Sequence, residues 1–369
     1  MAFLHKQTIT KIEIWPVFIP TTTPFVVATG RLDQTHNLFI RITLHSGTWG
    51  IGEIAPFPDI TGEDVPSSFA VAKDLAGSLL GHPVSVFRKI SDQLLEQAPA
   101  YPAARCGLET AVVDALCREA GLPLWALWGG ADVRQRETDI TIPICDLEQT
   151  LALAQHWHAQ GFQIFKLKVG QHLEEDIHRI EALHQHFPKV RFILDANQGF
   201  QKDDVLRFMK CLHAFHDQIM LLEQPIHKDD PEGMVSLRQS LQVPIAADES
   251  VSTLEEARMV IRQGAADYIN IKITKSGLIQ GLDIAALART SGIRLMIGGM
   301  LETRVAMGCS WSMVLGSGGF DILDLDTPLL LSKDPVSGGY EYSGPFLKPW
   351  DKPGLDMDSP ATSDVHIIE

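Results

Sequence analysis

Short runs of apolar and β-branched residues alternate with amphipathic stretches along the second part of the chain. Eight such runs lie at 140–146, 162–170, 189–197, 219–226, 243–250, 266–274, 293–299 and 320–326. The stretches between them carry apolar residues at helical spacing, and several end in glycine, which is typical of a helix C-terminus. This alternation predicts an α/β fold with a parallel (β/α)8 barrel. A doubly wound open sheet would alternate in the same way, but the count of eight strands favours closure.

The N-terminal part of the chain follows a different pattern. Alternating runs at 10–19, 37–44 and 48–56 predict an antiparallel meander, and helical patterns follow near 67–81, 84–97 and 101–120. We therefore expect an α+β capping domain over 1–130 and the barrel over 131–326. The segment 327–369 is rich in Pro, Gly and Asp, and we expect it to pack back on the cap.

Composition narrows the class of protein. The chain has 369 residues, of which 45% are hydrophobic and 21% charged, as in ordinary globular proteins. Its formal net charge of −15 argues against nucleic acid or an acidic membrane as a partner. No apolar run is long enough to span a membrane, and no phosphate-binding glycine motif follows a strand. The five scattered cysteines are typical of reduced thiols in a cytoplasmic protein, and a homo-oligomer is compatible with this sequence, which leaves the oligomeric state open.

Two lysines interrupt the second apolar run, which reads FKLKVG over 165–170. Lys166 and Lys168 are two positions apart, so on a strand both side chains point to the same side. Placing two ammonium groups together inside a barrel is costly unless other groups compensate for them. The pattern therefore indicates a functional site at this strand.

Further charged residues follow the end of each successive strand. From Lys166 the chain reaches Asp195, Glu223, Asp248 and Lys272 at intervals of 29, 28, 25 and 24 residues, about one strand–helix unit each. The active site of such a barrel lies at the C-terminal ends of its strands, so these groups should converge there. Taken singly, the three carboxylates could cap a turn, pair with an arginine or cap a helix. Taken together, they form an all-oxygen donor set that suits Mg²⁺.

The lysines on the second and sixth strands should lie on opposite sides of the mouth. A lysine can act as a base near neutral pH when burial and neighbouring cations lower its pKa. We expect this of Lys168 and Lys272. The alternative is that Lys272, followed by Lys275, only closes the barrel rim by pairing with a carboxylate.

These motifs resemble those of the enolase superfamily, in its muconate-lactonizing subgroup. The resemblance rests on KLK (166–168), LDAN (194–197), EQP (223–225), ADES (247–250) and INIKITKSG (269–277), and the segment 106–130 of the cap is also similar. It implies Mg²⁺ bound by Asp195, Glu223 and Asp248, with Lys168 and Lys272 flanking the substrate α-carbon and Lys166 stabilising an enolate oxygen. Gly277-Leu278 departs from the two glycines of many relatives, which puts only the local loop shape in doubt.

A DLD motif at 324–326 distinguishes among the reactions of this subgroup. On a strand, Asp324 and Asp326 point to the same side and could receive an ammonium group away from the metal. The pair resembles the DxD motif of dipeptide epimerases, although Asp326 could instead cap a helix that begins near Thr327-Pro328. We therefore expect a Mg²⁺-dependent dipeptide epimerase that inverts the α-carbon of the C-terminal residue. In this reading Thr141, Gly299 and Met300 help to bind the dipeptide.

Two alternatives stay open. The same site could serve an o-succinylbenzoate synthase or an N-acylamino acid racemase, or the barrel could be a binding module without catalysis. The cap segments Pro20–Arg31 and Ile54–Asp64 are expected to set side-chain preference. Asp59, Glu63 and Asp64 in the second segment hint at a cationic substrate side chain, although a solvated loop face would carry the same acids.

Overall fold

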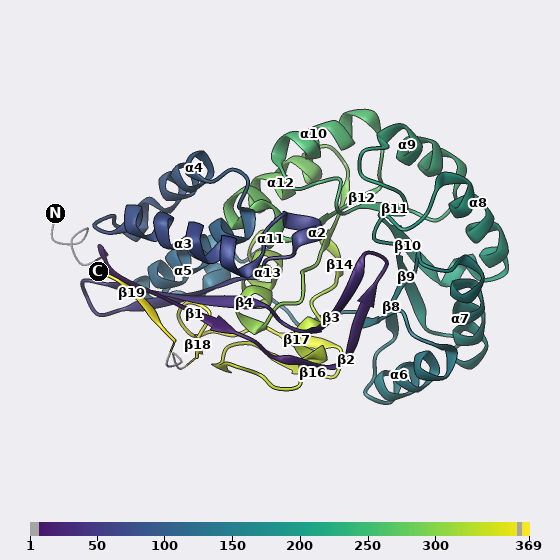
Figure 1. Cartoon of the computed structure of the whole chain (residues 1–369), viewed down its shortest axis with the longest axis horizontal. Coiled ribbons are helices and arrows are strands. Elements are labelled where there is room, and N and C mark those ends of the chain that lie inside the picture. Colours follow the sequence, from purple (N-terminus) through teal and green to yellow (C-terminus); the bar gives the residue numbers. More distant parts are fainter. Residues whose placement is uncertain (1–6, 360–363) are drawn as a thin grey trace.

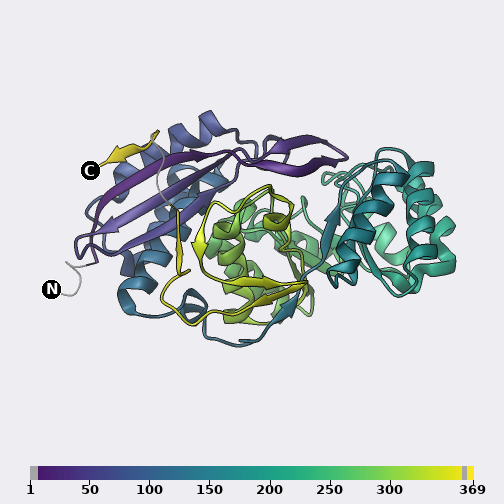
Figure 2. The ribbon, with the colours of Figure 1, turned by 90° about the horizontal axis from the view of Figure 1, so that it is seen from below.

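The computed structural model describes residues 7–359 and 364–369, and it places a barrel beside a cap (Figure 1). Outer helices surround the strands of the barrel, while the cap consists of an antiparallel sheet covered by helices. A long hairpin of the cap reaches toward the barrel, as Figure 2 shows from below. Within the described ranges, no helix is long and apolar enough to cross a bilayer.

Eight parallel strands form one continuous sheet in chain order. They are β7 (Ile140–Ile142), β8 (Ile164–Lys168), β9 (Arg191–Asp195), β10 (Ile219–Glu223), β11 (Ile245–Ala247), β12 (Tyr268–Ile271), β13 (Arg294–Ile297) and β14 (Phe320–Leu323). Each strand lies within one of the predicted apolar runs, so the predicted barrel is confirmed. The strands are shorter than the runs because the last residues of each run leave the sheet and form the loops of the mouth.

Helices cover the outside of this sheet. They are α6 (Leu147–Ala159), α7 (Leu173–His186), α8 (Lys202–Cys211), η3 (Leu212–Gln218), α9 (Pro231–Ser240), α10 (Leu254–Gln263), α11 (Ile273–Ser276), α12 (Leu278–Thr290) and α13 (Arg304–Ser317). Their ends carry the signals that the sequence indicates. Thr253 and Glu256 form a capping box at the start of α10, and Gly264 ends that helix in the left-handed conformation.

The two edges of the sheet meet through hydrogen bonds between the segment before β7 and the end of β14. The Asp139 N–H donates to the Leu323 carbonyl at 3.1 Å, and the Leu325 N–H donates to Thr138 Oγ1 at 2.9 Å. The first and last strands are thus staggered: the residue just before β7 lies level with the end of β14. The tilt of barrel strands requires such a displacement. These hydrogen bonds connect the first and last strands of the sheet.

The cap consists of a sheet and helices that share a second apolar core. Its elements are β1 (Ile9–Val17), β4 (Asn37–Leu44), β5 (Trp49–Ile54), α3 (Val65–Leu79), η1 (Val84–Val86), α4 (Phe87–Gln97), α5 (Pro102–Ala120) and η2 (Leu124–Trp128). Helix α5 packs closely on β5 because Gly50 and Gly52 lack side chains. A Cβ on these glycines would lie 2.2 Å from the Ala115 nitrogen and 2.0 Å from the Gly107 carbonyl oxygen, respectively.

The two cap segments expected over the mouth contain regular structure. Residues 20–34 form an antiparallel hairpin of β2 (Pro20–Val27) and β3 (Gly30–Gln34), and α2 (Pro58–Thr61) forms a short turn of helix. The sequence did not indicate the hairpin because β2 projects from the cap and buries only Val27, so it lacks an apolar face. Glu63 accepts hydrogen bonds from the Ala103 and Ala104 N–H groups at the start of α5, and Asp64 caps α3. Two of the three acids that hinted at a cationic substrate therefore have structural roles.

The C-terminal segment contacts both the cap and the barrel side of the molecule. Its elements are η4 (Thr327–Leu330), β15 (Ser337–Gly338), β16 (Glu341–Ser343), β17 (Phe346–Lys348), β18 (Met357–Asp358) and β19 (His366–Ile368). Strand β19 pairs with β1 in the cap, and β17 pairs with β6 (Arg136–Glu137) just before the barrel begins. The division into 1–130, 131–326 and 327–369 stays a proposal.

Candidate active site

The side chains inside the barrel are arranged in layers, because they alternate with a period of two along each strand. The lowest layer is apolar and takes one residue from each of the strands β8 to β14: Ile164, Ile193, Leu221, Ala246, Tyr268, Met296 and Ile322. Two positions further along the chain, the corresponding residues are Lys166, Asp195, Glu223, Asp248, Asn270, Gly298 and Asp324. The charged residues that the sequence singled out thus form a polar layer directly above an apolar one.

Lys166 lies at the centre of this polar layer and is 1% exposed. Its Nζ is 3.0 Å from Asp195 Oδ2, 2.9 Å from Glu223 Oε2 and 2.6 Å from Asp324 Oδ2. One ammonium group therefore contacts carboxylates from three strands. This arrangement explains how an apolar run can carry a buried lysine, since burial of the charge is compensated by ion pairs.

Lys168 and Lys272 lie above this layer, and they extend from β8 and from the end of β12, which are four positions apart in the sheet. Lys168 Nζ is 2.6 Å from Asp195 Oδ2 and donates to Asn197 Oδ1 at 3.1 Å. Lys272 Nζ is 2.7 Å from Asp248 Oδ2. Lys272 thus pairs with a carboxylate, as the rim-closing alternative expected, but it also lines the cavity in the mouth, whereas Lys275, which pairs with the same Asp248, does not.

The pKa of Lys272 differs from the sequence-based expectation, and the pKa of Lys166 is shifted in the same direction. Burial lowers the pKa of Lys166, but Asp195, Asp324 and Glu223 outweigh burial and raise that pKa well above its usual range. Burial also lowers the pKa of Lys272, and Asp248 more than offsets it, so the pKa is raised. The lowering predicted for Lys272 is therefore wrong while this lysine pairs with Asp248. The sequence showed the cations around each lysine, but not how closely the acids would approach.

The carboxylates at the ends of β9, β10 and β11 differ in charge state. Burial raises the pKa of Asp195, but Lys166 and Lys168 hold it well below its usual range. Lys272 and Lys275 have the same effect on Asp248. Burial, together with the charge of Asp195, raises the pKa of Glu223 to about 7.

These three carboxylates fit a hard divalent cation. Among the described residues, Glu223 Oε2 and Asp248 Oδ2 accept no hydrogen bond of regular geometry, and each faces a lysine ammonium group at 2.9 and 2.7 Å, respectively. Buried carboxylate oxygens without a firm donor are available as ligands, and an all-oxygen donor set suits Mg²⁺. The residues present therefore fit the ion that the sequence predicted.

A second carboxylate cluster lies on the other side of Lys166. It consists of Asp324 and Asp326, which the sequence predicted, and Asp139, which it did not; one carboxylate oxygen from each lies within 4.8 Å of the others. Asp326 Oδ2 accepts a hydrogen bond from the Thr141 N–H at 2.5 Å, and its side chain does not cap η4. Asp326 therefore stands at the N-cap position of η4, as the alternative expected, but its carboxylate does not serve as the cap. Burial and the charge of Asp324 raise the pKa of Asp326 to about 7.

Asp139 is the most isolated carboxyl group of this cluster. It is fully buried, and neither of its carboxylate oxygens accepts a hydrogen bond from the described residues. Burial, Asp324 and Asp326 together raise its pKa well above the usual range. The sequence contained an indication that Asp139 faces the interior. Asp139 and Thr141 are two positions apart, so a strand that points Thr141 to the interior points Asp139 there too.

The predicted substrate-binding residues lie around a cavity of about 40 Å³ above the polar layer. Thr141, Gly299, Met300 and Asp324 line it together with all three catalytic candidates: Lys166, Lys168 and Lys272. The cap contributes a further lining that the sequence did not identify individually: Phe25, Val27, Thr29, Phe57 and Ile60. Asp326 lies behind this surface, since it is fully buried and does not line the cavity.

Residues beside the ligands hold them in place. Gln224 Oε1 accepts hydrogen bonds from the Asp248 and Ser250 N–H groups, and the Asn197 amide links Lys168 to Glu249. Asn197 and Gln224 adopt left-handed φ values of 40° and 32°, a strain that often marks functional sites. Glu249, whose direction the sequence left open, is buried beside Asp248 because both follow the last residue of β11.

Comparison with known proteins agrees with this geometry. Residues 9–129 match the mandelate racemase / muconate lactonizing enzyme N-terminal domain, and residues 149–359 match the enolase C-terminal domain-like model. The chain is 40% identical to an L-Ala-D/L-amino acid epimerase of Populus trichocarpa over 95% of this chain and 85% of the relative. It is 37% identical to an aromatic dipeptide epimerase of Herpetosiphon aurantiacus, over 92% and 96% of the two chains.

A solved structure with bound ligands is also similar. The dipeptide epimerase of Cytophaga hutchinsonii, complexed with Mg and the dipeptide D-Ala-L-Val, superposes with a TM-score of 0.93 at 29% identity. The match covers 98% of this chain and 99% of that one. With its cap, its barrel and its buried ring of lysines and carboxylates, this chain belongs to the mandelate racemase/muconate lactonizing enzyme family of the enolase superfamily.

Proposed function

We propose that this isomerase of the enolase superfamily is a Mg²⁺-dependent dipeptide epimerase that inverts the α-carbon of the C-terminal residue. The observation that carries the proposal is the presence, in one buried mouth, of two opposed lysines and a separate carboxylate cluster around Asp324. The lysines suit removal and return of an α-proton, and the cluster suits an ammonium group. A dipeptide with a free amino group would use both features.

The residues that would hold the metal are Asp195, Glu223 and Asp248, at the ends of three neighbouring strands. When bound, the ion supplies positive charge that stabilises the negative charge developing on the substrate carboxylate. Asn270 donates to Glu223 Oε1 at 2.8 Å, and Gln224 positions the backbone of Asp248. These contacts would fix the direction of the ligands before substrate binds.

Lys168 and Lys272 are the proposed bases. They extend from β8 and from the end of β12, which are four positions apart in the sheet, so each can reach only one face of a planar enediolate between them. One lysine would remove the α-proton from one face, and the other would deliver a proton to the opposite face. Lys166, which contacts three carboxylates, would stay charged and stabilise an enediolate oxygen.

Asp324 and Asp326 would receive the free α-amino group. Asp324 lines the cavity on the side of β14, away from the proposed metal ligands, and Asp326 supports it from behind. The substrates of an o-succinylbenzoate synthase or an N-acylamino acid racemase carry no such ammonium group. A carboxylate pair at this place would repel them, which favours a dipeptide.

Exchange of the α-proton in D₂O tests the two-base assignment. Lys168→Ala and Lys272→Ala should each lower the rate of epimerisation by about 10²–10⁴-fold or more, because one of the two proton transfers loses its base. Each single variant should still exchange the α-proton of one diastereomer with retention of configuration. From the family resemblance, Lys272→Ala should exchange only the L,D substrate and Lys168→Ala only the L,L substrate.

Lys166→Ala serves as the matched comparison. It should eliminate exchange of both diastereomers, because Lys166 acts on the oxygen and not on one face. Loss of the α-proton signal in NMR, measured for both diastereomers and all three variants, distinguishes these outcomes. A lysine variant that still interconverts the diastereomers at nearly the wild-type rate would contradict the two-base mechanism.

A further inference from the structure

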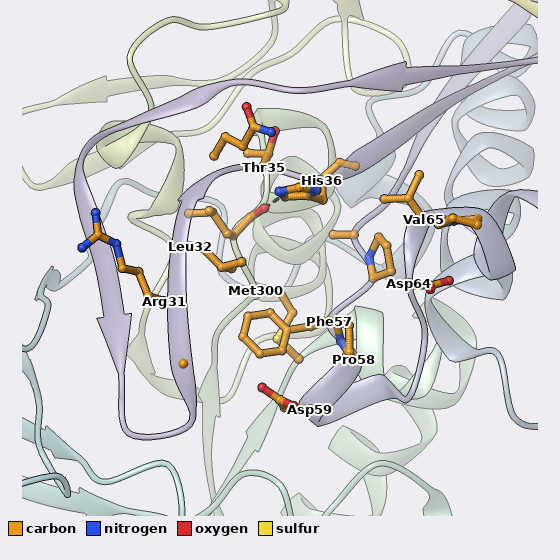
Figure 3. A pocket seen from close by; sticks show the side chains of 17 residues that line it. Arg31, Leu32, Thr35, His36, Phe57, Pro58, Asp59, Asp64, Val65 and Met300 are labelled. Atoms are coloured by element: carbon orange, nitrogen blue, oxygen red, sulfur yellow. Dashed lines mark hydrogen bonds between the residues drawn. The ribbon is translucent and has the colours of Figure 1, made fainter.

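A second, larger cavity adjoins the catalytic one. It has a volume of about 380 Å³ and lies between β3, the segment from Ala55 to Pro66, and the loop that follows β13 (Figure 3). Phe57, Met300 and Leu301 line both cavities, so the two spaces are direct neighbours. The volume falls within the range of about 300–1,000 Å³ that is common for small-molecule sites.

The lining of this second cavity is largely apolar. The apolar part comes from three separate segments: Leu32, Ala55, Pro56, Phe57, Pro58, Val65, Pro66, Met300 and Leu301. In Figure 3 the labelled side chains of Leu32, Phe57 and Met300 surround the space from different elements. Such a surface binds apolar groups and discriminates against charged ones.

Most polar groups in the lining are already engaged by neighbours within the protein. The Asn37 amide donates to Glu53 Oε1 and to the Leu301 carbonyl, and Thr35 Oγ1 donates to the Val17 carbonyl. Asp64 accepts from the Ser67 N–H, and Arg31 pairs with Asp33. These groups hold the walls in place, while Gln34, His36 and Asp59 also line the cavity.

The position of the cavity relative to the ammonium site indicates which part of a dipeptide it would hold. Met300 follows β13, which lies between β14, directly before Asp324, and β12, directly before Lys272. The amino group at Asp324 belongs to the N-terminal residue, so the side chain of that residue starts beside Met300. The α-carbon of the C-terminal residue would lie instead between Lys168 and Lys272, on the side of Phe25, which faces Lys168 and lines only the catalytic cavity.

We infer that the second cavity binds the side chain of the N-terminal residue of the substrate, and that large apolar side chains are preferred there. This inference rests on the proposed dipeptide epimerase function. Leucine, methionine and phenylalanine at the N-terminal position fit the volume and the apolar lining. Glutamate does not, because Asp59 and Asp64 also line this cavity and would repel a further carboxylate.

Two substrate series test the inference with the wild-type enzyme and Mg²⁺. The first varies the N-terminal residue of X-L-Ala, with X as Ala, Leu, Phe, Glu or Lys; the second varies the C-terminal residue of L-Ala-X. Rates of α-proton exchange in D₂O give kcat/KM for each dipeptide. L-Leu-L-Ala and L-Phe-L-Ala should exceed L-Ala-L-Ala by about tenfold to a hundredfold, as burial of a large apolar side chain allows, and the glutamyl substrate should fall below it. A lysyl substrate that reacts faster than both apolar ones would contradict the inference.

A substitution at Leu32 locates the effect. Leu32→Phe fills part of the cavity from β3, and it should lower the ratio of kcat/KM for L-Phe-L-Ala to that for L-Ala-L-Ala by about tenfold. The matched control is Leu206→Phe on the outer face of α8, where the leucine is 37% exposed, and this change should leave the ratio unaltered. The series in the wild-type enzyme remains decisive even if the Leu32 variant does not fold.

The outcomes separate this inference from the proposed function. If dipeptides exchange their α-proton but the N-terminal series is flat, or only the C-terminal series responds to Leu32→Phe, the inference is wrong and the epimerase function stands. If no dipeptide in either series exchanges its α-proton, the proposed function itself fails.

Discussion

The two carboxylate clusters of the barrel mouth are built from the same residue types and are equally buried, yet lysines surround only one of them. Asp195, Glu223 and Asp248 contact four ammonium groups, those of Lys166, Lys168, Lys272 and Lys275. In the cluster of Asp139, Asp324 and Asp326, the only lysine contact within the described residues is that of Lys166 with Asp324. Acidic residue type and burial alone therefore do not define the electrostatic character of a site.

The difference in lysine contacts shifts the pKa values of Asp195 and Asp248 opposite to those of Asp139 and Asp326, whereas the pKa of Glu223 in the first cluster is raised to about 7. Lysines hold the pKa values of Asp195 and Asp248 below the usual range, so both carboxylates are ready to bind a metal. In the second cluster burial dominates, and the pKa values of Asp139 and Asp326 are raised. The first cluster thus suits a divalent cation, whereas in the second cluster burial favours the protonated forms of Asp139 and Asp326. Three predictions, in order of decreasing effect, test this distinction.

Metal removal should have the largest effect. Chelation should abolish epimerisation, by on the order of a thousandfold or more, and Mg²⁺ should restore it. Glu223→Gln should weaken Mg²⁺ binding by at least about a hundredfold, since loss of an outer-shell contact alone commonly costs up to that much. Calorimetric titration of the chelated protein with Mg²⁺ measures this without reference to activity.

Asp139→Asn is the matched control for the metal prediction. Asp139, Asp324 and Asp326 also lie close enough together to hold an ion, so this variant tests whether the second cluster binds the metal. If Asp139→Asn weakens Mg²⁺ binding and Glu223→Gln does not, the metal belongs to the second cluster and the assignment of the two clusters must be exchanged.

Most of the first cluster could be predicted from the sequence. Its members end successive strands, and regular spacing together with the common direction of barrel strands places them at one mouth. Asp139 was missed because it stands before an apolar run, at the start of its strand. Only the stagger between β7 and β14 brings it level with Asp324, and stagger is a property of the closed barrel that no single run contains.

Neither the larger cavity nor the lysine ion pairs could be predicted from the sequence, and the reason differs from that for Asp139. The cavity forms where β3, the segment before α3 and the loop after β13 meet, and these are far apart in the chain. The pKa of Lys166 depends on three carboxylates approaching within 3.0 Å, which periodicity does not determine. Sequence patterns give the direction of a side chain, whereas charge state depends on distances.

The second prediction tests the ammonium site and has an intermediate effect. Asp324→Asn should lower kcat/KM for dipeptides by about ten- to a hundredfold, as expected for a buried charged hydrogen bond worth about 1.5–3 kcal/mol. An N-acetylated dipeptide should be a poor substrate of the wild-type enzyme, and Asp324→Asn should affect it less. Equal turnover of the free and acetylated dipeptides would favour the N-acylamino acid racemase alternative.

The third prediction concerns stability and has the smallest effect. Burial, Asp324 and Asp326 raise the pKa of Asp139 in the folded protein, while Lys166 opposes the shift and Glu223 adds to it. The folded state then binds a proton more readily than the unfolded chain, where the pKa is about 3.9. The contribution of Asp139 to stability is therefore fully present below the unfolded pKa and is lost as pH rises toward the folded pKa. An asparagine side chain does not titrate, so the Asp139→Asn variant should escape this loss.

Asp139→Asn should consequently match the wild type in stability near pH 4 and become more stable than it at pH 8, by on the order of 1 kcal/mol or more. Chemical denaturation of the metal-loaded, substrate-free enzyme at several pH values measures the difference. Asp64→Asn is a control of opposite sign, because hydrogen bonds from Ser67 lower the pKa of exposed Asp64, and its contribution is lost as pH falls. If Asp139→Asn instead destabilises the protein at pH 8, Asp139 is ionised and compensated there. The second cluster would then resemble the first in charge state, and the distinction between a metal site and a proton-holding ammonium site would no longer hold.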